Sequence, residues 1–259
     1  MPSHVARKRF GQNFLVDRQV VARIVDLLAL HTDDRVVEIG PGLGALTGPL
    51  VRLLDHLHVV EIDRELIARL LREFPSDRLT VHAGDALAFD FARLAVDCRG
   101  GLRIVGNLPY NISTPLLFHL AGFADCVRDM HFMLQREVVE RMVAEPGSAA
   151  FGRLSVMLQY RFVMERLLDV QPTAFRPEPR VHSAVVRLLP RAAADLSAHD
   201  AVRFAGLVAA AFAQRRKMLR NSLGGLFDET RLAELGIAPT SRAENLSVHD
   251  YVRLANSLQ

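Results

Sequence analysis

Apolar and polar residues along the first two-thirds of the chain follow a repeated strand-and-helix order. Apolar residues recur at helical spacing from Asp17 to Leu30, and Asp17 stands where it can cap the helix start. β-Branched runs then alternate with helical stretches, and the expected strands are 35–40, 58–63, 79–85, 102–107 and 130–135. This order predicts an α/β fold with a mostly parallel sheet, which binds ligands beyond the carboxyl ends of its strands.

The pattern changes in the last third of the chain. Two extended runs, 161–170 and 183–190, flank a proline-rich stretch and predict a hairpin-like pair at the sheet edge. Downstream, only helical patterning remains, including one long stretch over 201–223. We therefore expect two domains, a sheet domain at 1–190 and a small C-terminal helical domain at 191–259.

Composition narrows the possible classes of protein. Half of the 259 residues are apolar, which is enough for a sizeable core, and the net charge of +3 fits a nucleic-acid partner without requiring one. Cys98 and Cys126 have no partner at metal-ligand spacing, and the histidines form no ligand motif, so we expect neither a disulfide nor a metal site. No signal peptide or membrane-spanning run is evident, and we expect a cytoplasmic protein with no membrane partner.

The expected strand ends carry residues that suit a nucleotide. The glycines of "GPGLG" (40–44) let the backbone approach a ligand closely. Glu61 follows roughly 20 residues later, where a carboxylate can accept both hydroxyls of a ribose. Asp85 ends the third strand, where it can bind an adenine amino group, and Asn107 ends the fourth. These polar groups should face one crevice.

Two nucleotide ligands compete for this crevice, a redox dinucleotide and S-adenosylmethionine. The dinucleotide fingerprint G-x-G-x-x-G has no counterpart. If it began at Gly40, its third glycine would fall at position 45, which is alanine, and the next glycine is Gly48. Glu38 would repel a pyrophosphate but suits a ligand with an ammonium and a sulfonium. We favour S-adenosylmethionine and a Rossmann-like sheet of the class I S-adenosylmethionine-dependent methyltransferase type.

The segment "NLPY" (107–110) fits the activation of a nucleobase amino group. The side-chain oxygen of Asn107 and the carbonyl of Leu108 can each accept one amino hydrogen and aim the nitrogen lone pair at a methyl donor. Pro109 stiffens the backbone, and Tyr110 offers a face on which an extruded base can stack. A plain turn before a helix near Ser113 would explain the same residues. The amino group of cytosine could also be bound by the same two acceptors.

Several segments together resemble the bacterial 16S rRNA adenine N6-dimethyltransferases, nearly from end to end. They are "RKRFGQNFL" (7–15), "VVEIGPGLGALT" (36–47), "EIDREL" (61–66), "GDAL" (84–87), "NLPYNIS" (107–113), "MLQREVVERM" (133–142), "FRPEPRVHSAVVRL" (175–188), "FAQRRKMLRNSL" (212–223) and "RAENLSVHDYVRLAN" (242–256). The resemblance implies transfer of four methyl groups from S-adenosylmethionine to two adjacent adenosines in the 3′-terminal hairpin loop of 16S rRNA, within the immature 30S subunit. We expect the enzyme to act as a monomer.

The resemblance also assigns residues. It implies cofactor contacts at Asn13, Leu15, Gly40, Glu61, Asp85 and Asn107. The strand-end pattern alone indicates the last four, whereas Asn13 and Leu15 rest on the resemblance. The expected catalytic group is Asn107, Leu108, Pro109, Tyr110 and Phe175. Phe175 stands among prolines that limit its freedom, and we expect it to form the second face of a base sandwich opposite Tyr110, although a hydrophobic plug at the sheet edge is the alternative.

Basic residues indicate where RNA would bind. Arg176 and Arg180 flank the proline-rich stretch and can hold phosphates. The wider expected footprint, centred on the helical domain, adds Arg7, Lys8, Arg9, Arg215, Arg216, Lys217 and Arg220. An ordinary solvated helix face also explains the cluster over 215–220.

Two other functions remain to be weighed. The large-subunit rRNA adenine methylase of erythromycin resistance shares the sheet and the Asn-x-Pro-aromatic motif, but the segments at 212–223 and 242–256 favour the small-subunit family. A non-catalytic rRNA-binding assembly factor could keep the same fold. The complete set of cofactor and acceptor residues argues against such a factor.

Overall fold

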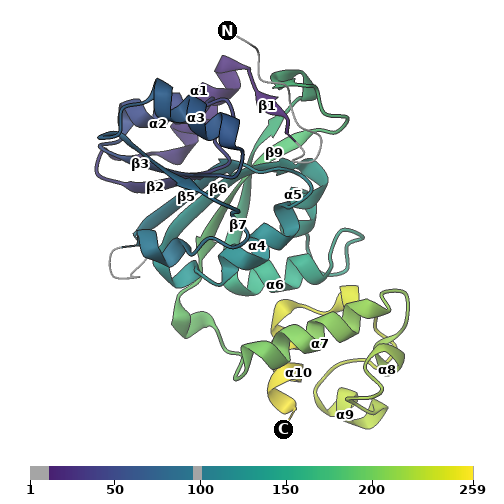
Figure 1. Cartoon of the computed structure of the whole chain (residues 1–259). Helices are drawn as coiled ribbons and strands as arrows, with labels where there is room; N and C mark the ends of the chain where they lie inside the picture. Colours follow the sequence, from purple (N-terminus) through teal and green to yellow (C-terminus); the bar gives the residue numbers. More distant parts are fainter. Residues whose placement is uncertain (1–11, 96–100, 259) are drawn as a thin grey trace. The chain divides into compact units, whose positions relative to one another are not determined.

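The computed structural model describes residues 12–95 and 101–258, and its centre is a seven-stranded sheet in the order β4-β3-β2-β5-β6-β9-β7 (Figure 1). The strands are β2 (Arg35–Ile39), β3 (Leu57–Glu61), β4 (Leu79–Ala83), β5 (Leu102–Asn107), β6 (Val127–Gln135), β7 (Phe162–Val170) and β9 (Ser183–Pro190). The strands from β4 to β6 run parallel, and β9 is antiparallel to β6. Strand order reverses between β2 and β5, which is where sheets of this kind bind ligands.

Helices follow the strands as the sequence pattern predicts. They are α1 (Arg18–Leu28), α2 (Thr47–Leu53), α3 (Arg64–Glu73), α4 (Ser113–Ala121), α5 (Arg136–Met142), α6 (Arg153–Arg161), α7 (Ala201–Ala213), α8 (Leu219–Ser222), α9 (Glu229–Glu234) and α10 (Val248–Ser257). Helices α1, α2 and α3 cover one face of the sheet and α4 lies on the other (Figure 1). The Asp17 carboxylate accepts hydrogen bonds from the Gln19 and Val20 amides at 2.8 and 3.1 Å, which confirms the predicted helix cap.

A separate two-stranded sheet joins the start of the described chain to the proline-rich stretch. Strand β1 (Phe14–Leu15) pairs antiparallel with β8 (Phe175–Arg176), so that Leu15 lies opposite Phe175. The Val16 amide continues the pairing with a hydrogen bond of 2.8 Å to the Ala174 carbonyl. A segment far from β8 in sequence is thereby held beside it.

The chain divides into two compact units, Met1–Val139 with Met164–Pro190 and Glu140–Val163 with Arg191–Gln259. The expected boundary at 190 agrees with this division, but 140–163 belongs to the second unit, and the predicted sheet domain of 1–190 is corrected accordingly. The reason is burial: Phe151 and Val156 pack in the same apolar core as residues of α7 and α10.

The predicted edge pair is confirmed, because β7 and β9 are neighbours and β7 lies at the edge of the sheet. The single long helix predicted over 201–223 is wrong. Helix α7 ends at Ala213, and the exposed residues 214–217 turn the chain before α8 begins. The turn lets Leu219 become fully buried while its amide donates to the Ser241 carbonyl at 2.7 Å.

No helix within the described ranges combines the length and the apolar character that crossing a membrane requires.

A buried ion-pair network holds together the amino-terminal ends of β2, β5 and β6. Arg103 in β5 is only 4% exposed, and its guanidinium lies 2.6 Å from the Asp34 carboxylate and 2.8 Å from the Asp129 carboxylate. It also donates to the Leu28 carbonyl at 2.5 Å, at the end of α1. One side chain therefore ties α1 to the loop before β2, to β5 and to β6.

Replacing Arg103 should destabilise the protein strongly. We expect Arg103→Met to lower the free energy of unfolding by about 3–5 kcal/mol, because the buried Asp129 carboxylate loses its guanidinium partner and Asp34 keeps only the exposed Arg128 at 3.1 Å. The exposed pair of Arg69 and Glu73, at 2.8 Å, offers a control, and Arg69→Met should cost less than about 1 kcal/mol. Urea titrations followed by circular dichroism would measure both, and equal losses would contradict the role of Arg103.

Candidate functional site

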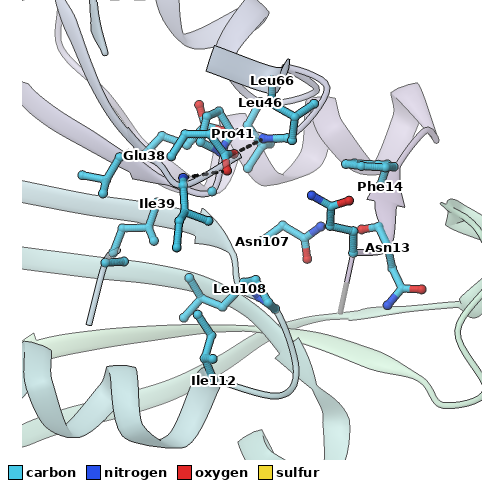
Figure 2. A pocket seen from close by; sticks show the side chains of 18 of the residues that line it. Asn13, Phe14, Glu38, Ile39, Pro41, Leu46, Leu66, Asn107, Leu108 and Ile112 are labelled. Carbon is cyan, nitrogen blue, oxygen red and sulfur yellow. Dashed lines mark hydrogen bonds between the residues drawn. The ribbon is translucent and has the colours of Figure 1, made fainter. Parts of the chain in front are cut away.

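A pocket of about 300 Å³ opens at the carboxyl ends of β2, β3, β4 and β5 (Figure 2). Its walls come from residues 12–15, 38–43, 45–46, 60–62, 66, 84–87 and 107–112. Among the described residues that line it, the charged side chains are the carboxylates Glu38, Glu61 and Asp85, and none is basic. The pocket therefore suits a cationic ligand better than a pyrophosphate.

The glycine turn after β2 forms one wall. Gly40, Gly42 and Gly44 adopt φ of +66°, +58° and +84°, a left-handed backbone that side chains rarely allow. The Gly40 amide donates to the Val60 carbonyl at 2.9 Å, which holds the turn against β3. A Cβ atom on Gly42 would lie 3.1 Å from the Phe14 ring, so the N-terminal segment packs directly on this turn.

Glu38 is a buried carboxylate in the pocket wall, only 2% exposed (Figure 2). Its Oε2 accepts a hydrogen bond of 2.7 Å from the Thr47 hydroxyl. Burial raises the pKa of Glu38 to about 8, the Thr47 hydrogen bond partly opposes this, and the Glu61 charge adds to it. A nearby positive charge would favour the ionised form of this group.

Glu61 and Asp85 follow the next two strands. The Glu61 Oε1 accepts hydrogen bonds of 2.9 Å from the Ile62 and Asp63 amides, and its Oε2 accepts one of 3.4 Å from the Gly42 amide. Burial raises the pKa of Glu61, and these amides lower it in part. Asp85 is exposed at the pocket, and its Oδ1 accepts from the Leu87 amide at 2.9 Å.

Asn107 stands on the opposite side of the glycine turn, at the end of β5. Its Nδ2 donates to the Asn13 carbonyl at 3.0 Å, and Figure 2 shows the two residues together. A carbonyl can only accept, so this bond orients the amide and leaves Oδ1 as the acceptor on the other side. The next residue, Leu108, is anchored by its amide, which donates to the Met133 carbonyl at 3.1 Å.

Gly106 sets the distance between the two halves of the site. A Cβ atom at this position would lie 2.6 Å from the Ile39 carbonyl oxygen, closer than real Cβ atoms come. The backbones of β5 and β2 can approach this closely only because Gly106 has no side chain. Asn107 and Gly40, the next residues on the two strands, are thereby brought to the same pocket.

Tyr110 lines the pocket beyond Asn107 and is half-buried. Its hydroxyl lies 2.7 Å from the Ser183 hydroxyl at the start of β9, and its carbonyl accepts a hydrogen bond of 3.1 Å from Ser113. Burial raises the pKa of Tyr110, against the Ser183 hydrogen bond, so the phenol stays neutral near pH 7.

The structure brings together most of the residues expected from the sequence. The pocket is lined by Asn13, Leu15, Gly40, Glu61, Asp85, Asn107, Leu108, Pro109 and Tyr110. Phe175 is the correction. Its side chain is 0% exposed and packs in the apolar core with Leu15 and Ala174, so it presents no face to a base in this structure. The alternative of a hydrophobic plug describes it correctly.

The expected RNA-binding residues belong to both units. Arg215 pairs with Glu244 at 2.8 Å and also donates to the Ala149 carbonyl, so it supports the second unit. Arg216 and Lys217 are exposed in the turn after α7, and Arg220 lies in α8, 3.3 Å from Glu229. The residues of the first unit, Arg176 and Arg180, are both exposed. Arg7, Lys8 and Arg9 lie outside the described residues.

Sequence reasoning missed three residues of the site. Ser183 and Phe14 lie inside segments that carry the family resemblance, but no spacing indicates their contacts. Gly106 precedes the acceptor segment and is recognisable only from the approach of β2. Within the part of the chain that the structure describes, no group of histidine, cysteine or carboxylate side chains is placed to hold a metal ion.

The strand order, the reversal between β2 and β5 and the pocket at that point define the class I methyltransferase fold. Two solved structures share it at 25% identity: a dimethyladenosine transferase from Plasmodium falciparum, with a TM-score of 0.78 over 93% of this chain and 95% of that one, and the 23S rRNA methyltransferase ErmE, with a TM-score of 0.71 over 95% and 99%.

Residues 3–259 match the ribosomal RNA adenine dimethylase family, and the chain belongs to it. Relatives named ribosomal RNA small subunit methyltransferase A include one from Dechloromonas aromatica, 60% identical over 258 residues and the full length of both chains. Another, from Thiobacillus denitrificans, is 62% identical over 248 residues, 96% of each chain. The expected fold class and family are confirmed.

The raised pKa of Glu38 predicts how stability depends on pH. Its usual value is 4.5 and its value in the folded protein about 8, so folding favours the protonated form, and wild type loses stability as pH rises from 4.5 towards 8. Glu38→Gln keeps an acceptor for Thr47 without a charge. We expect the variant to gain at least about 1.4 kcal/mol over wild type between pH 5 and pH 8, the equivalent of one pKa unit.

Urea unfolding of both proteins at pH 5, 6.5 and 8, without ligand, would measure this difference. A constant difference across these pH values would show that Glu38 does not titrate in the window. Thr47→Val is the matched control, because it removes the hydroxyl that stabilises the ionised carboxylate. It should steepen the loss of stability towards pH 8.

Proposed function

We propose that this chain transfers methyl groups from S-adenosylmethionine to N6 of two adjacent adenosines in the 3′-terminal hairpin loop of 16S rRNA, during assembly of the small subunit. The observation that carries the proposal is the position of Asn107 and Leu108 in the wall of a pocket charged only by carboxylates among its described residues. The two hydrogen-bond acceptors for an amino group and a site for a cationic nucleotide thus lie in one cavity.

The residues present fit S-adenosylmethionine, whose sulfonium supplies an activated methyl group. Glu61, at the end of β3, would accept the ribose hydroxyls, and Asp85, after β4, the adenine amino group. The positive charge of the ligand would favour the ionised form of Glu38, which would then lie near the cationic portion, and the open backbone at Gly40 allows close approach. Leu15 and Asn13 complete the wall from the N-terminal side.

The acceptor residues can activate an amino group that is otherwise a poor nucleophile. Asn107 Oδ1 and the Leu108 carbonyl would each accept one N6 hydrogen, drawing the lone pair out of conjugation with the ring. The orientation of the Asn107 amide is already fixed by its bond to Asn13. Tyr110 would stack on the extruded base, and Pro109 limits the movement of the segment between them.

Full-length relatives named for the small subunit support 16S rRNA over 23S rRNA as the substrate. These relatives are about 60% identical over the entire chain, including the helical second unit, whereas ErmE is 25% identical. A non-catalytic assembly factor is the other candidate. The complete pocket argues against it, because a protein that only binds RNA has no chemical need for Glu61, Asp85 and Asn107 together.

The decisive test is incubation of the purified protein with labelled S-adenosylmethionine and immature small subunits, followed by nucleoside analysis. We expect N6,N6-dimethyladenosine in 16S rRNA. A parallel incubation with protein-free 23S rRNA tests the large-subunit alternative, which label in that RNA and not in 16S rRNA would favour. No transfer to any rRNA, with binding to the subunit retained, would favour the non-catalytic factor.

Asn107→Ala should abolish catalysis selectively. We expect methyl transfer to fall at least about 100-fold, because the variant loses one acceptor that acts on the reacting nitrogen. Affinity for small-subunit RNA should stay within about twofold of wild type, since no phosphate contact is removed. Single-turnover transfer and filter binding would measure the two quantities. Transfer at the wild-type rate would contradict the proposed role of Asn107 as an acceptor of an N6 hydrogen.

The exposed pair Arg216 and Lys217 should contribute to RNA affinity. We expect the double reversal Arg216→Glu, Lys217→Glu to weaken binding and to make its dependence on salt shallower by about one unit of slope for each lost phosphate contact. Arg215 is unsuitable for this test because it pairs with Glu244. The control is the double reversal Arg23→Glu, Arg72→Glu at exposed positions of α1 and α3, which changes the net charge by the same amount, and an equal effect there would show only a change in net charge.

A further inference from the structure

Tyr110 is held at two points. Its hydroxyl lies 2.7 Å from the Ser183 hydroxyl, and its backbone carbonyl accepts a hydrogen bond of 3.1 Å from Ser113. The two serines differ in their surroundings: Ser113 belongs to the same turn as Tyr110, whereas Ser183 is 73 residues away in sequence. The bond to Ser183 is therefore a tertiary contact that fixes the ring relative to the sheet.

Ser183 is a rigid anchor. Its side chain is fully buried, and its backbone lies opposite Gln135 in the register of β9 with β6. The residue before it is also held, because the His182 carbonyl accepts a hydrogen bond of 2.9 Å from the Arg136 amide. The hydroxyl that meets Tyr110 thus projects from backbone fixed on both sides.

Strand β6 also anchors Leu108, the residue that carries the acceptor carbonyl. The Leu108 amide donates to the Met133 carbonyl of β6 at 3.1 Å, and Ser183 pairs with the end of β6 only two residues further on. Strand β6 therefore sets the positions of both the Leu108 peptide and the Tyr110 hydroxyl. The hydrogen bond between the Tyr110 and Ser183 hydroxyls therefore fixes the position of the ring axis relative to the Leu108 peptide.

The geometry of tyrosine explains what this bond controls. The phenolic oxygen lies on the axis about which the ring flips, so a hydrogen bond to it fixes the direction of that axis and leaves the flip to neighbouring side chains. The ring of a phenylalanine at this position would keep its stacking face but lose this restraint. The hydroxyl therefore matters for position and the ring for contact.

We propose that Ser183 is a positioning residue for methyl transfer, which holds the axis of the Tyr110 ring where the amino group of the stacked base lies between Asn107 and Leu108. The proposal rests on the function proposed above, because it assumes that a base stacks on Tyr110. It assigns a role to the end of the "FRPEPRVHS" segment, whose first residue, Phe175, is buried in this structure.

The test is a double-mutant cycle with Tyr110→Phe, Ser183→Ala and the combination of both. Each single variant should lower kcat for methyl transfer about tenfold, the change that corresponds to one neutral hydrogen bond. The KM for S-adenosylmethionine should not change. The double variant should be no slower than the slower single variant, because both substitutions remove the same bond.

Three outcomes would overturn the proposal: additive losses in the double variant, wild-type kcat in both single variants, or a loss that appears in KM for S-adenosylmethionine. Ser155→Ala is the matched control for losing a buried serine hydroxyl, because Ser155 in α6 donates to the Arg141 carbonyl at 2.5 Å and does not line the pocket. It should lower the melting temperature and leave kcat unchanged.

The cycle separates this inference from the proposed function. Transfer by wild type on immature small subunits tests the function, and only the comparison of the variants tests Ser183. If Ser183→Ala does not fold, Tyr110→Phe with wild type still decides the question, because it removes the same bond from the half-buried partner. An unchanged kcat in Tyr110→Phe would then overturn the proposal alone.

Discussion

The site depends on one close contact, the approach of β5 to β2 at Gly106. A Cβ atom there would stand 2.6 Å from the Ile39 carbonyl, so any larger residue would separate the strands or distort them. The contact lies just before Gly40 on one strand and just before Asn107 on the other. Parallel pairing of β2 with β5 brings both residues to the same edge of the sheet, and the missing side chain brings them close. The cofactor side and the acceptor side are therefore joined by backbone.

The pocket is electrostatically unfavourable until a ligand arrives. Glu38 and Glu61 are buried in its wall, and burial raises the pKa of each. Such carboxylates cost stability in the free protein and favour a positively charged ligand, a common form of the conflict between stability and function. The backbone amides around Glu61 relieve part of this cost for one carboxylate. Glu38 has the Thr47 hydroxyl, and its pKa remains near 8.

The sequence predicts the parts of the site that follow strand ends, and it fails where distant segments meet. Gly40, Glu61, Asp85 and Asn107 could be assigned because parallel strands deliver their carboxyl ends to one edge. Asn13 and Leu15 could not, since a two-residue strand has no periodicity and its partner, β8, lies about 160 residues away. Phe175 was misassigned for the same reason, because its burial follows from the pairing of β8 with the distant strand β1. The break between α7 and α8 depends on the burial of Leu219, which helical spacing alone does not reveal.

The corrected place of Phe175 suggests why the N-terminal segment belongs to the site. Phe14 packs on the glycine turn, and the Asn13 carbonyl orients the Asn107 amide. Leu15 pairs with Phe175 and shares its apolar core. Residues 13–15 thus contact the cofactor side, the acceptor side and the strand β8 in three successive positions. Burial of Phe175 against Leu15 therefore helps to hold the segment whose Asn13 carbonyl orients the Asn107 amide.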